Sequence, residues 1–530
     1  MVRELLSRPL SRTQGVQMAR YKDYCYEQGK MIPISFREQI LPGTFEYTLS
    51  HLVDHELDLS VFDQRYNNDD TGRPAYDPAL LLKIVLYAYA RGIVSSRQIE
   101  RCCRENVIFM ALSADTQPHF TTIADFISRM EGEIVALFRN VLLICDAQGL
   151  IGREMFAIDG CKLPSNASKE WSGTKAELAA KQAKLERAIR RMLATHRERD
   201  QREVGAETVE REQQYIATLK RQVKKLKAWL DDHEDKPGKT GKPRKSNVID
   251  NDSAKMKTSH GVMQGYDGVA AVDDRHQVIV HAEAFGEAQE HELLQPMLQA
   301  TEAHFAALGE DTIYRKVKIT ADSGFHTERN AEYLYANHID GYLADNRMRS
   351  RDPRFLEVDK YKTRSREEKR QWEGRPERFT NKDFRYDPNQ QTCICPAGKS
   401  LYSNGSNVFF NGYAAVKFRA PKSACRPCHL RSRCLKFPDR TEVRQVAFFS
   451  GETRKPETFT QAMKRKIDSL AGKAVYNRRI ATVEPVFGHL RNIGLDRFTL
   501  RGRKKVDAQW KLYCIVHNML KIHRYGVESG

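Results

Sequence analysis

Two acidic residues stand at the ends of short apolar runs, and each is followed by a small residue. Asp159 lies in MFAIDGCKL, and Asp322 lies in KVKITADSGF. Both runs are typical of buried strands, and a carboxylate at a strand end reaches into the crevice where ligands tend to bind. A single aspartate of this kind usually caps a turn, but two on neighbouring strands would repel each other unless they shared a cation. Oxygen ligands of this type suit Mg²⁺ or Mn²⁺.

A third acid, Glu484, lies in the basic segment VYNRRIATVEPVFGHLR. Apolar residues at helical spacing predict that Glu484 lies on or beside the core-facing side of a helix: Ile480, Val483, Phe487 and Leu490. A buried glutamate without a partner is costly, so it would pair with an arginine or help to hold a pair of metal ions. Pro485 removes a backbone donor and disfavours helical geometry at Glu484, which predicts a kink or a helix start there.

A cluster of cysteines predicts a second kind of metal site. Cys425 and Cys428 have the spacing of a metal knuckle, and Cys395 and Cys434 complete four thiolates that suit structural Zn²⁺. Cys393 is a fifth cysteine beside them; the turn Cys-Pro-x-Gly favours Cys395, but spacing alone does not choose between the two. The simpler alternative is a set of free thiols in loops.

The charge balance indicates a polyanionic partner. The chain has a net charge of +18, and nucleic acid is the commonest large polyanion. The run LRGRKKV is a candidate phosphate-binding patch, or else a solvated loop; its basic residues are Arg501, Arg503, Lys504 and Lys505. No segment has the pattern of a membrane span or an export signal, which predicts a cytoplasmic protein whose cysteines do not form a disulfide framework.

The elements that must position these residues suggest four parts. Residues 1–150 read as a helical domain for DNA binding or dimerisation. Residues 151–171, 245–346 and 462–530 have the pattern of an α/β layer with a mixed sheet. Residues 172–244 predict an antiparallel helical hairpin followed by a basic linker, and 347–461 form the cysteine-containing insertion. Weaker candidates for a functional role are Asp252, His291, Trp171 and Trp372, for which caps, helix starts and apolar clusters are the simpler explanations.

Taken together, these motifs resemble those of a known family. Asp159, Asp322 and Glu484 resemble the DDE triad of insertion-sequence transposases with a ribonuclease-H-like catalytic domain. The segments that carry the resemblance span residues 35–524: SSRQIE, PHFTTIADF, IDGCKLPSNAS, GYDGVAAVD, ADSGF and EPVFGHLR. The helical hairpin and the four-cysteine insertion narrow it to the family named after insertion sequence 1182.

The resemblance implies a bacterial cytoplasmic enzyme, associated with the nucleoid when bound to DNA. It would bind the inverted repeats of transposon ends as a homodimer, hydrolyse phosphodiesters with Mg²⁺ or Mn²⁺, and transfer the freed 3′-OH to target DNA. It also implies that Tyr476, Arg479 and Arg491 bind phosphates, although Arg479 precedes Glu484 by five residues rather than four, and Arg491 replaces a lysine. The alternatives are a domesticated nuclease and a catalytically inactive DNA-binding protein that keeps the fold.

Overall fold

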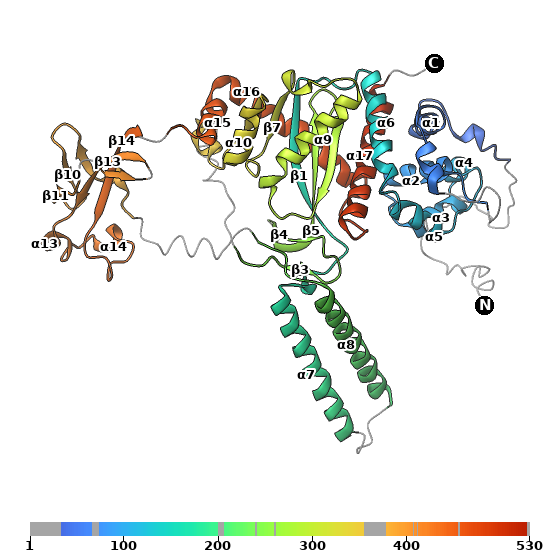
Figure 1. Cartoon of the computed structure of the whole chain (residues 1–530), viewed down its shortest axis with the longest axis horizontal. Coiled ribbons are helices and arrows are strands. Elements are labelled where there is room, and N and C mark those ends of the chain that lie inside the picture. The colour runs from blue at the N-terminus through green and yellow to red at the C-terminus, as the bar shows by residue number, and fades with distance from the viewer. Residues whose placement is uncertain are drawn as a thin grey trace, which may run out of the picture.

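The structure is a computed structural model that describes residues 33–65, 74–199, 206–238, 241–258, 261–353, 378–405, 408–410, 412–453 and 456–526. Trp372 lies outside these ranges. Figure 1 shows a central sheet with flanking helices and a long helical hairpin that projects away from it. Within the described residues, no helix is long and apolar enough to cross a membrane.

The N-terminal region is helical, as predicted. Its α-helices are α1 (Phe45–His51), α2 (Pro78–Ala90), α3 (Ser96–Glu105), α4 (Val107–Leu112), α5 (Phe120–Ser128) and α6 (Glu133–Ala147). The side chain of Asp77 accepts a hydrogen bond from the amide of Ala79 and caps α2, whose first residue is Pro78. The apolar side of α2 is buried in a core that continues into the sheet region.

The central sheet mixes parallel and antiparallel strands. Its strands are β1 (Met155–Pro164), β4 (Ala254–Thr258), β5 (Gly261–Asp273), β6 (Ile279–Phe285), β7 (Lys318–Ala321) and β8 (Gly341–Leu343). The order is β4-β5-β1-β7-β8, and β6 also pairs with β5. β1 is antiparallel to β5 and parallel to β7, and β7 is parallel to β8. The predicted mixed α/β layer is therefore confirmed.

Helices from distant parts of the chain cover this sheet: α9 (Leu294–Ala307), α10 (Glu328–Ala336), α15 (Phe459–Asp468), α16 (Leu470–Asn492) and α17 (Arg503–Tyr525). Asp159 on β1 contacts Arg479 of α16, and a methyl group at Gly268 would touch the ring of Trp510 on α17. The neighbouring Lys162, which points to the other face of β1, pairs with Glu290 just before α9. α16 and α17 thus cover one face, and α9 begins on the other.

Pro485 lies inside α16, so the predicted helix start at this residue is wrong. A proline at this position cannot donate to the carbonyl one turn earlier, which belongs to Ala481. The side-chain amide of Gln277, in the turn between β5 and β6, donates to that carbonyl at 3.1 Å. The backbone acceptor therefore keeps a partner, and the helix continues through the proline.

The helical hairpin consists of α7 (Lys175–Arg199) and α8 (Ala206–Asp232). Apolar side chains of the two helices pack against each other in two small clusters, the first centred on Leu178, Leu226 and Trp229, and the second on Ile189, Ile216 and Leu219. The predicted antiparallel hairpin is therefore present in the structure. Trp171 packs against the first cluster, with the ammonium group of Lys181 4.7 Å from its ring centre.

The insertion between β8 and α15 forms its own sheet, in the order β12-β13-β11-β10-β9, with β14 paired to β13. The strands are β9 (Arg385–Asp387), β10 (Thr392–Ile394), β11 (Ser400–Ser403), β12 (Val408–Phe410), β13 (Tyr413–Arg419) and β14 (Gln445–Thr453). Three of the predicted zinc ligands lie in or between two short helices. Cys425 ends α13 (Lys422–Cys425), Cys434 ends α14 (Arg431–Cys434), and Cys428 lies between the two. A small apolar core holds this unit together, and it includes Phe384, Leu401 and Phe418.

Candidate active site

Asp159 and Asp322 lie next to each other on neighbouring parallel strands. Ile158 of β1 is paired with Ala321 of β7, so each aspartate is the residue directly after a paired position. The amide of Gly160 donates to Oδ1 of Asp159 at 2.9 Å, and the amide of Gly324 donates to Oδ1 of Asp322 at 2.8 Å. These backbone amides fix both carboxylates. Asp322 directly follows β7, as predicted, but Asp159 lies within β1, which continues to Pro164 along β5, so the strand end predicted at Asp159 is wrong.

Burial makes this position unfavourable for negative charge. It raises the pKa of Asp159 to about 6, against the opposing pull of Arg479, and the charge of Asp322 contributes to the rise. Burial likewise raises the pKa of Asp322, and Glu290 adds to it. A divalent cation between these carboxylates would remove the repulsion. The two aspartates therefore have the donor chemistry that Mg²⁺ or Mn²⁺ requires.

Arg479 is the cation closest to this site. Its Nη1 lies 2.8 Å from Oδ2 of Asp159, and both side chains are almost inaccessible to solvent. The guanidinium carbon is 5.7 Å from the ring centre of Tyr476, and Nε of Arg479 is buried without a hydrogen-bond partner among the described residues. In this arrangement Arg479 neutralises a predicted metal ligand, a contact that the phosphate-binding pattern did not predict.

Two further acids complete the surroundings, and sequence reasoning missed both. Glu290 pairs with Lys162 at 2.8 Å, and Asp267 is wholly buried with neither carboxylate oxygen hydrogen-bonded within the described residues. Burial raises the pKa of Asp267 well above its ordinary value, and the charge of Glu290 raises it further. Burial and the charge of Glu290 therefore favour the protonated form of Asp267, while the charge of Lys162 opposes it.

The glycines that follow the two aspartates make room for these acids. A methyl group at Gly160 would lie 2.6 Å from Oδ1 of Asp267. A methyl group at Gly324 would clash with Oε2 of Glu290 and lie 3.0 Å from Oδ1 of Asp322. Small residues at these two positions are therefore required by the neighbouring acids.

Neighbouring side chains brace the site rather than enter it. Gly324 presents its carbonyl oxygen 2.6 Å from Nδ1 of His291, which therefore donates to it and holds the loop after Asp322. Asp252 accepts a hydrogen bond from the amide of Arg503 at 2.9 Å, at the start of α17. The cap predicted for Asp252 is what the structure shows.

Glu484 is exposed on α16 and is not brought into a metal-binding cluster with the two aspartates. Among the described residues, no group of three or more His, Cys, Asp or Glu side chains is arranged to hold a metal ion. Arg491 lies almost directly below Glu484 on the same side of the helix, since seven residues make about two turns. Its Nη2 is 3.6 Å from Sγ of Cys161, which is on the same face of β1 as Asp159. Glu484 is thus on the same side of α16 as Arg491 and exposed to solvent, about 140° around the helix from Arg479.

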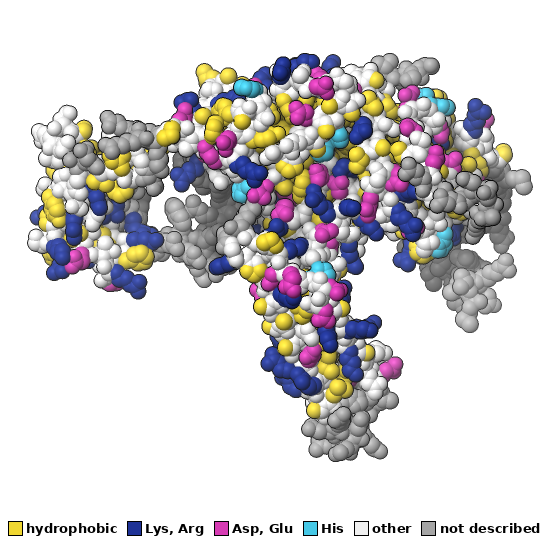
Figure 2. Space-filling view, in the orientation of Figure 1, with side chains coloured by type: hydrophobic (Ala, Val, Ile, Leu, Met, Phe, Trp, Pro, Cys, Tyr) yellow, Lys and Arg dark blue, Asp and Glu magenta, His cyan; other side chains and the backbone are white. Residues whose placement is uncertain are grey.

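The basic run before and within the first turn of α17 divides into two kinds of residue. Arg501 donates to the carbonyl of Asn166 at 2.8 Å, and Arg503 pairs with Glu283 at 2.6 Å. Lys504 and Lys505 are exposed in the first turn, which contains no acid. Positive charge is unfavourable at a helix N-terminus, so their presence has no explanation in helix stability. Figure 2 shows Lys and Arg spread over the visible face of the sheet region, the hairpin and the insertion, rather than gathered in one patch.

The four cysteines proposed for zinc line one small cavity in the insertion. Cys395, Cys425, Cys428 and Cys434 surround it, together with Arg444. The amide of Lys399 donates to Sγ of Cys395 at 3.4 Å. Cys393 lies instead in the apolar core on β10, where burial raises the pKa of its thiol to about 11. The placement therefore favours Cys395 over Cys393 as the fourth member of the group.

Two parts of the chain match models of known protein families. Residues 34–129 match the model of a transposase domain (DUF772), and residues 394–523 match the model of a transposase DDE domain. The second match includes Glu484 and the four cysteines, but not the two aspartates. No curated protein matches the chain. A DDE domain implies a ribonuclease-H-like fold, in agreement with the mixed sheet described above. The two matches therefore support a DDE-type transposase of an insertion sequence.

Proposed function

We propose that the chain is a DNA transposase of the family named after insertion sequence 1182. It would bind the inverted repeats at transposon ends, cleave them by metal-dependent hydrolysis and transfer the 3′-OH to target DNA. The observation that carries this proposal is the juxtaposition of Asp159 and Asp322 on adjacent strands, where their burial and mutual repulsion favour a shared divalent cation. Paired Mg²⁺ or Mn²⁺ ions would activate the attacking oxygen and stabilise the leaving one.

Each residue has a defined part in this proposal. Asp159 and Asp322 hold the metal, and Glu484 completes its ligands from α16. Arg479 competes for Oδ2 of Asp159 and, once displaced, is placed to contact a phosphate of the bound strand. Glu290 and Lys162 keep the charge of the crevice close to balanced.

The proposed DNA contacts follow α16 and the start of α17. Tyr476, Arg479 and Arg491 would contact the phosphates at the cleaved end. Arg501, Arg503, Lys504 and Lys505 would follow the backbone beyond it, with Lys504 and Lys505 the more important because their side chains have no structural role at a helix N-terminus. Two ends must be joined in transposition, so we propose that the protein acts on DNA as a homodimer.

We also propose that the insertion holds a structural Zn²⁺ ion between Cys395, Cys425, Cys428 and Cys434. Their common cavity and the amide donated to Cys395 support this ligand set. A four-thiolate site would stabilise a unit whose own apolar core is small. Metal analysis of the purified protein should find about one zinc ion per chain, lost in a Cys425→Ser and Cys428→Ser double variant.

The proposal is tested by cleavage of a duplex that carries the element's inverted repeat, in Mg²⁺. We expect the wild-type protein to cleave at the transposon end, and the isosteric variants Asp159→Asn, Asp322→Asn and Glu484→Gln to lose about a thousand-fold or more in rate. All four should bind the duplex. Binding without cleavage by the wild-type protein would instead favour the alternative of a catalytically inactive DNA-binding protein. Equal cleavage by Glu484→Gln would contradict its assignment as the third ligand.

A further inference from the structure

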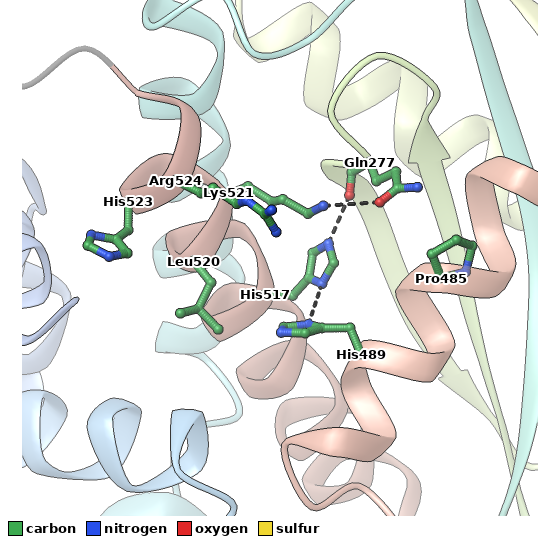
Figure 3. Close-up of a pocket in the computed structure, with 8 residues that line it drawn as sticks. All are labelled: Gln277, Pro485, His489, His517, Leu520, Lys521, His523 and Arg524. Atoms are coloured by element: carbon green, nitrogen blue, oxygen red, sulfur yellow. Dashed lines mark hydrogen bonds between the residues drawn. The ribbon is translucent and has the colours of Figure 1, made fainter. Parts of the chain in front are cut away.

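A cavity of about 490 Å³ lies between α16, α17 and the turn that joins β5 to β6 (Figure 3). Eight residues line it: Gln277, Pro485, His489, His517, Leu520, Lys521, His523 and Arg524. None of them is acidic. Pro485 is nine residues after Tyr476 and six after Arg479, which places it about 180° and about 120° around the helix from them, so the cavity lies on a different side of α16 from these two residues.

A chain of hydrogen bonds fixes the protonation of the two central histidines. Nε2 of His517 lies 2.8 Å from the carbonyl oxygen of Gln277, so this nitrogen carries a proton and donates it. Burial lowers the pKa of His517 to about 3, and its ring is therefore neutral, with Nδ1 as an acceptor. Nδ1 of His489, at 2.9 Å, must then be the donor in the pair. This leaves Nε2 of His489 as the nitrogen with no partner among the described residues.

The cationic groups of the cavity have no described carboxylate to balance them. Lys521 donates only to the neutral amide of Gln277, at 3.1 Å. Burial lowers the pKa of Lys521, and the charge of Arg524 lowers it further, with no acid opposing the two effects. Burial lowers the pKa of His489 as well, and there the only other contribution is the charge of Lys521. Two positive charges thus face a cavity that is lined by no acidic side chain of the described residues.

We propose that this cavity binds a phosphate group, with Lys521 and Arg524 supplying both the charge and the hydrogen-bond donors. An anion there would relieve the repulsion between the two cations, and the planar guanidinium of Arg524 suits phosphate geometry. The phosphate belongs either to the backbone of bound DNA, which rests on the proposed function, or to a free phosphate compound.

The cavity also connects two parts of the molecule. His523 on its wall has Nδ1 2.9 Å from Oγ1 of Thr48, and its ring packs edge-on against Phe45, both from α1. A ligand held by α17 at this point would stabilise the contact between the N-terminal helices and the sheet region. Binding should therefore be visible as a change in thermal stability.

The first test measures thermal unfolding with inorganic phosphate, with KCl used to hold the ionic strength constant. We expect phosphate to raise the Tm of the wild-type protein but not that of a Lys521→Gln and Arg524→Gln double variant. A matched control, Lys464→Gln with Arg329→Gln, removes the same charge from exposed positions elsewhere and should respond like the wild type. The single variant Arg524→Gln leaves the bond between Lys521 and Gln277 intact and should show an intermediate response. Equal Tm shifts in all four proteins would overturn the proposal.

The second test identifies the source of the phosphate by following duplex binding between 50 and 200 mM KCl. If the cavity holds a backbone phosphate, the slope of log K against log salt should be shallower by about 1 in the double variant than in the matched control. An unchanged slope, combined with a lost response to inorganic phosphate, assigns the cavity to a free phosphate compound. Neither assay requires a divalent metal or DNA cleavage. A protein that does not cleave DNA would therefore still show whether this cavity binds phosphate, and failure of one proposal can be told from failure of the other.

Discussion

The two flanks of α16 lie beside groups of opposite charge. On the flank of Tyr476, burial raises the pKa values of Asp159 and Asp322, which disfavours their negative charge. On the flank of Pro485 and His489, two cations face a cavity without an acid. In our proposals, one helix therefore separates a metal site from an anion site. In an enzyme that acts on DNA, both requirements are met by the same complex, metal on one side and phosphate on the other.

The first way to test this comparison is through Asp159. Its pKa of about 6 in the folded protein exceeds the ordinary 3.8, so its contribution to stability is present below about pH 4 and is lost as the pH rises through 6. In EDTA, the free energy of unfolding of the wild type relative to Asp159→Asn should fall by up to about 3 kcal/mol between pH 4 and 7.

Chemical denaturation of both proteins across this range measures the difference, and saturating Mg²⁺ should reduce it. If the free energies of unfolding of the two proteins change equally with pH, then folding does not raise the pKa of Asp159. The carboxylate flank would then have no particular need for a cation, and the contrast between the two flanks would disappear.

A second test adds a methyl group beside the carboxylates. In Gly324→Ala, the new methyl group clashes with Glu290 beside Asp322, so we expect a loss of about 2 kcal/mol in stability. Gly488→Ala is the matched control, because nothing lies within 4 Å of its added methyl group and alanine is the better helix former. Thermal unfolding should show opposite signs for the two variants. A neutral Gly324→Ala would mean that Glu290 is free to move away from Asp322.

The smallest effect tests how Gln277 supports the other flank. Its amide donates to the carbonyl that Pro485 leaves without a helical partner, so Gln277→Ala should cost about 1 kcal/mol. In a Pro485→Ala background the helix restores its own hydrogen bond, and the cost of Gln277→Ala should be smaller. A double-mutant cycle isolates this coupling, because the bond from Lys521 is lost in both backgrounds. Zero coupling energy would contradict the compensation.

Local sequence patterns predicted the features that depend on one element at a time. The apolar runs before Asp159 and Asp322 predicted two neighbouring strands, and the pattern of residues 172–244 predicted the helical hairpin. Contacts between distant segments could not be predicted in this way. Glu290 meets Asp322 only because α9 begins beside the end of β7, and Arg479 reaches Asp159 across 320 residues of sequence. The helix start predicted as one alternative at Pro485 was wrong for the same reason, since the compensating donor is Gln277, more than 200 residues earlier.

The central claim is that Asp159 and Asp322 together hold a divalent metal ion. Its most direct test is to measure Mn²⁺ binding to the protein without DNA by titration calorimetry. The account predicts that the wild-type protein binds Mn²⁺ and that Asp159→Asn and Asp322→Asn each weaken this binding by about tenfold or more. Arg479→Gln, which removes the competing cation from Asp159, should strengthen it. Equal Mn²⁺ affinity in the wild type and both aspartate variants would contradict the claim.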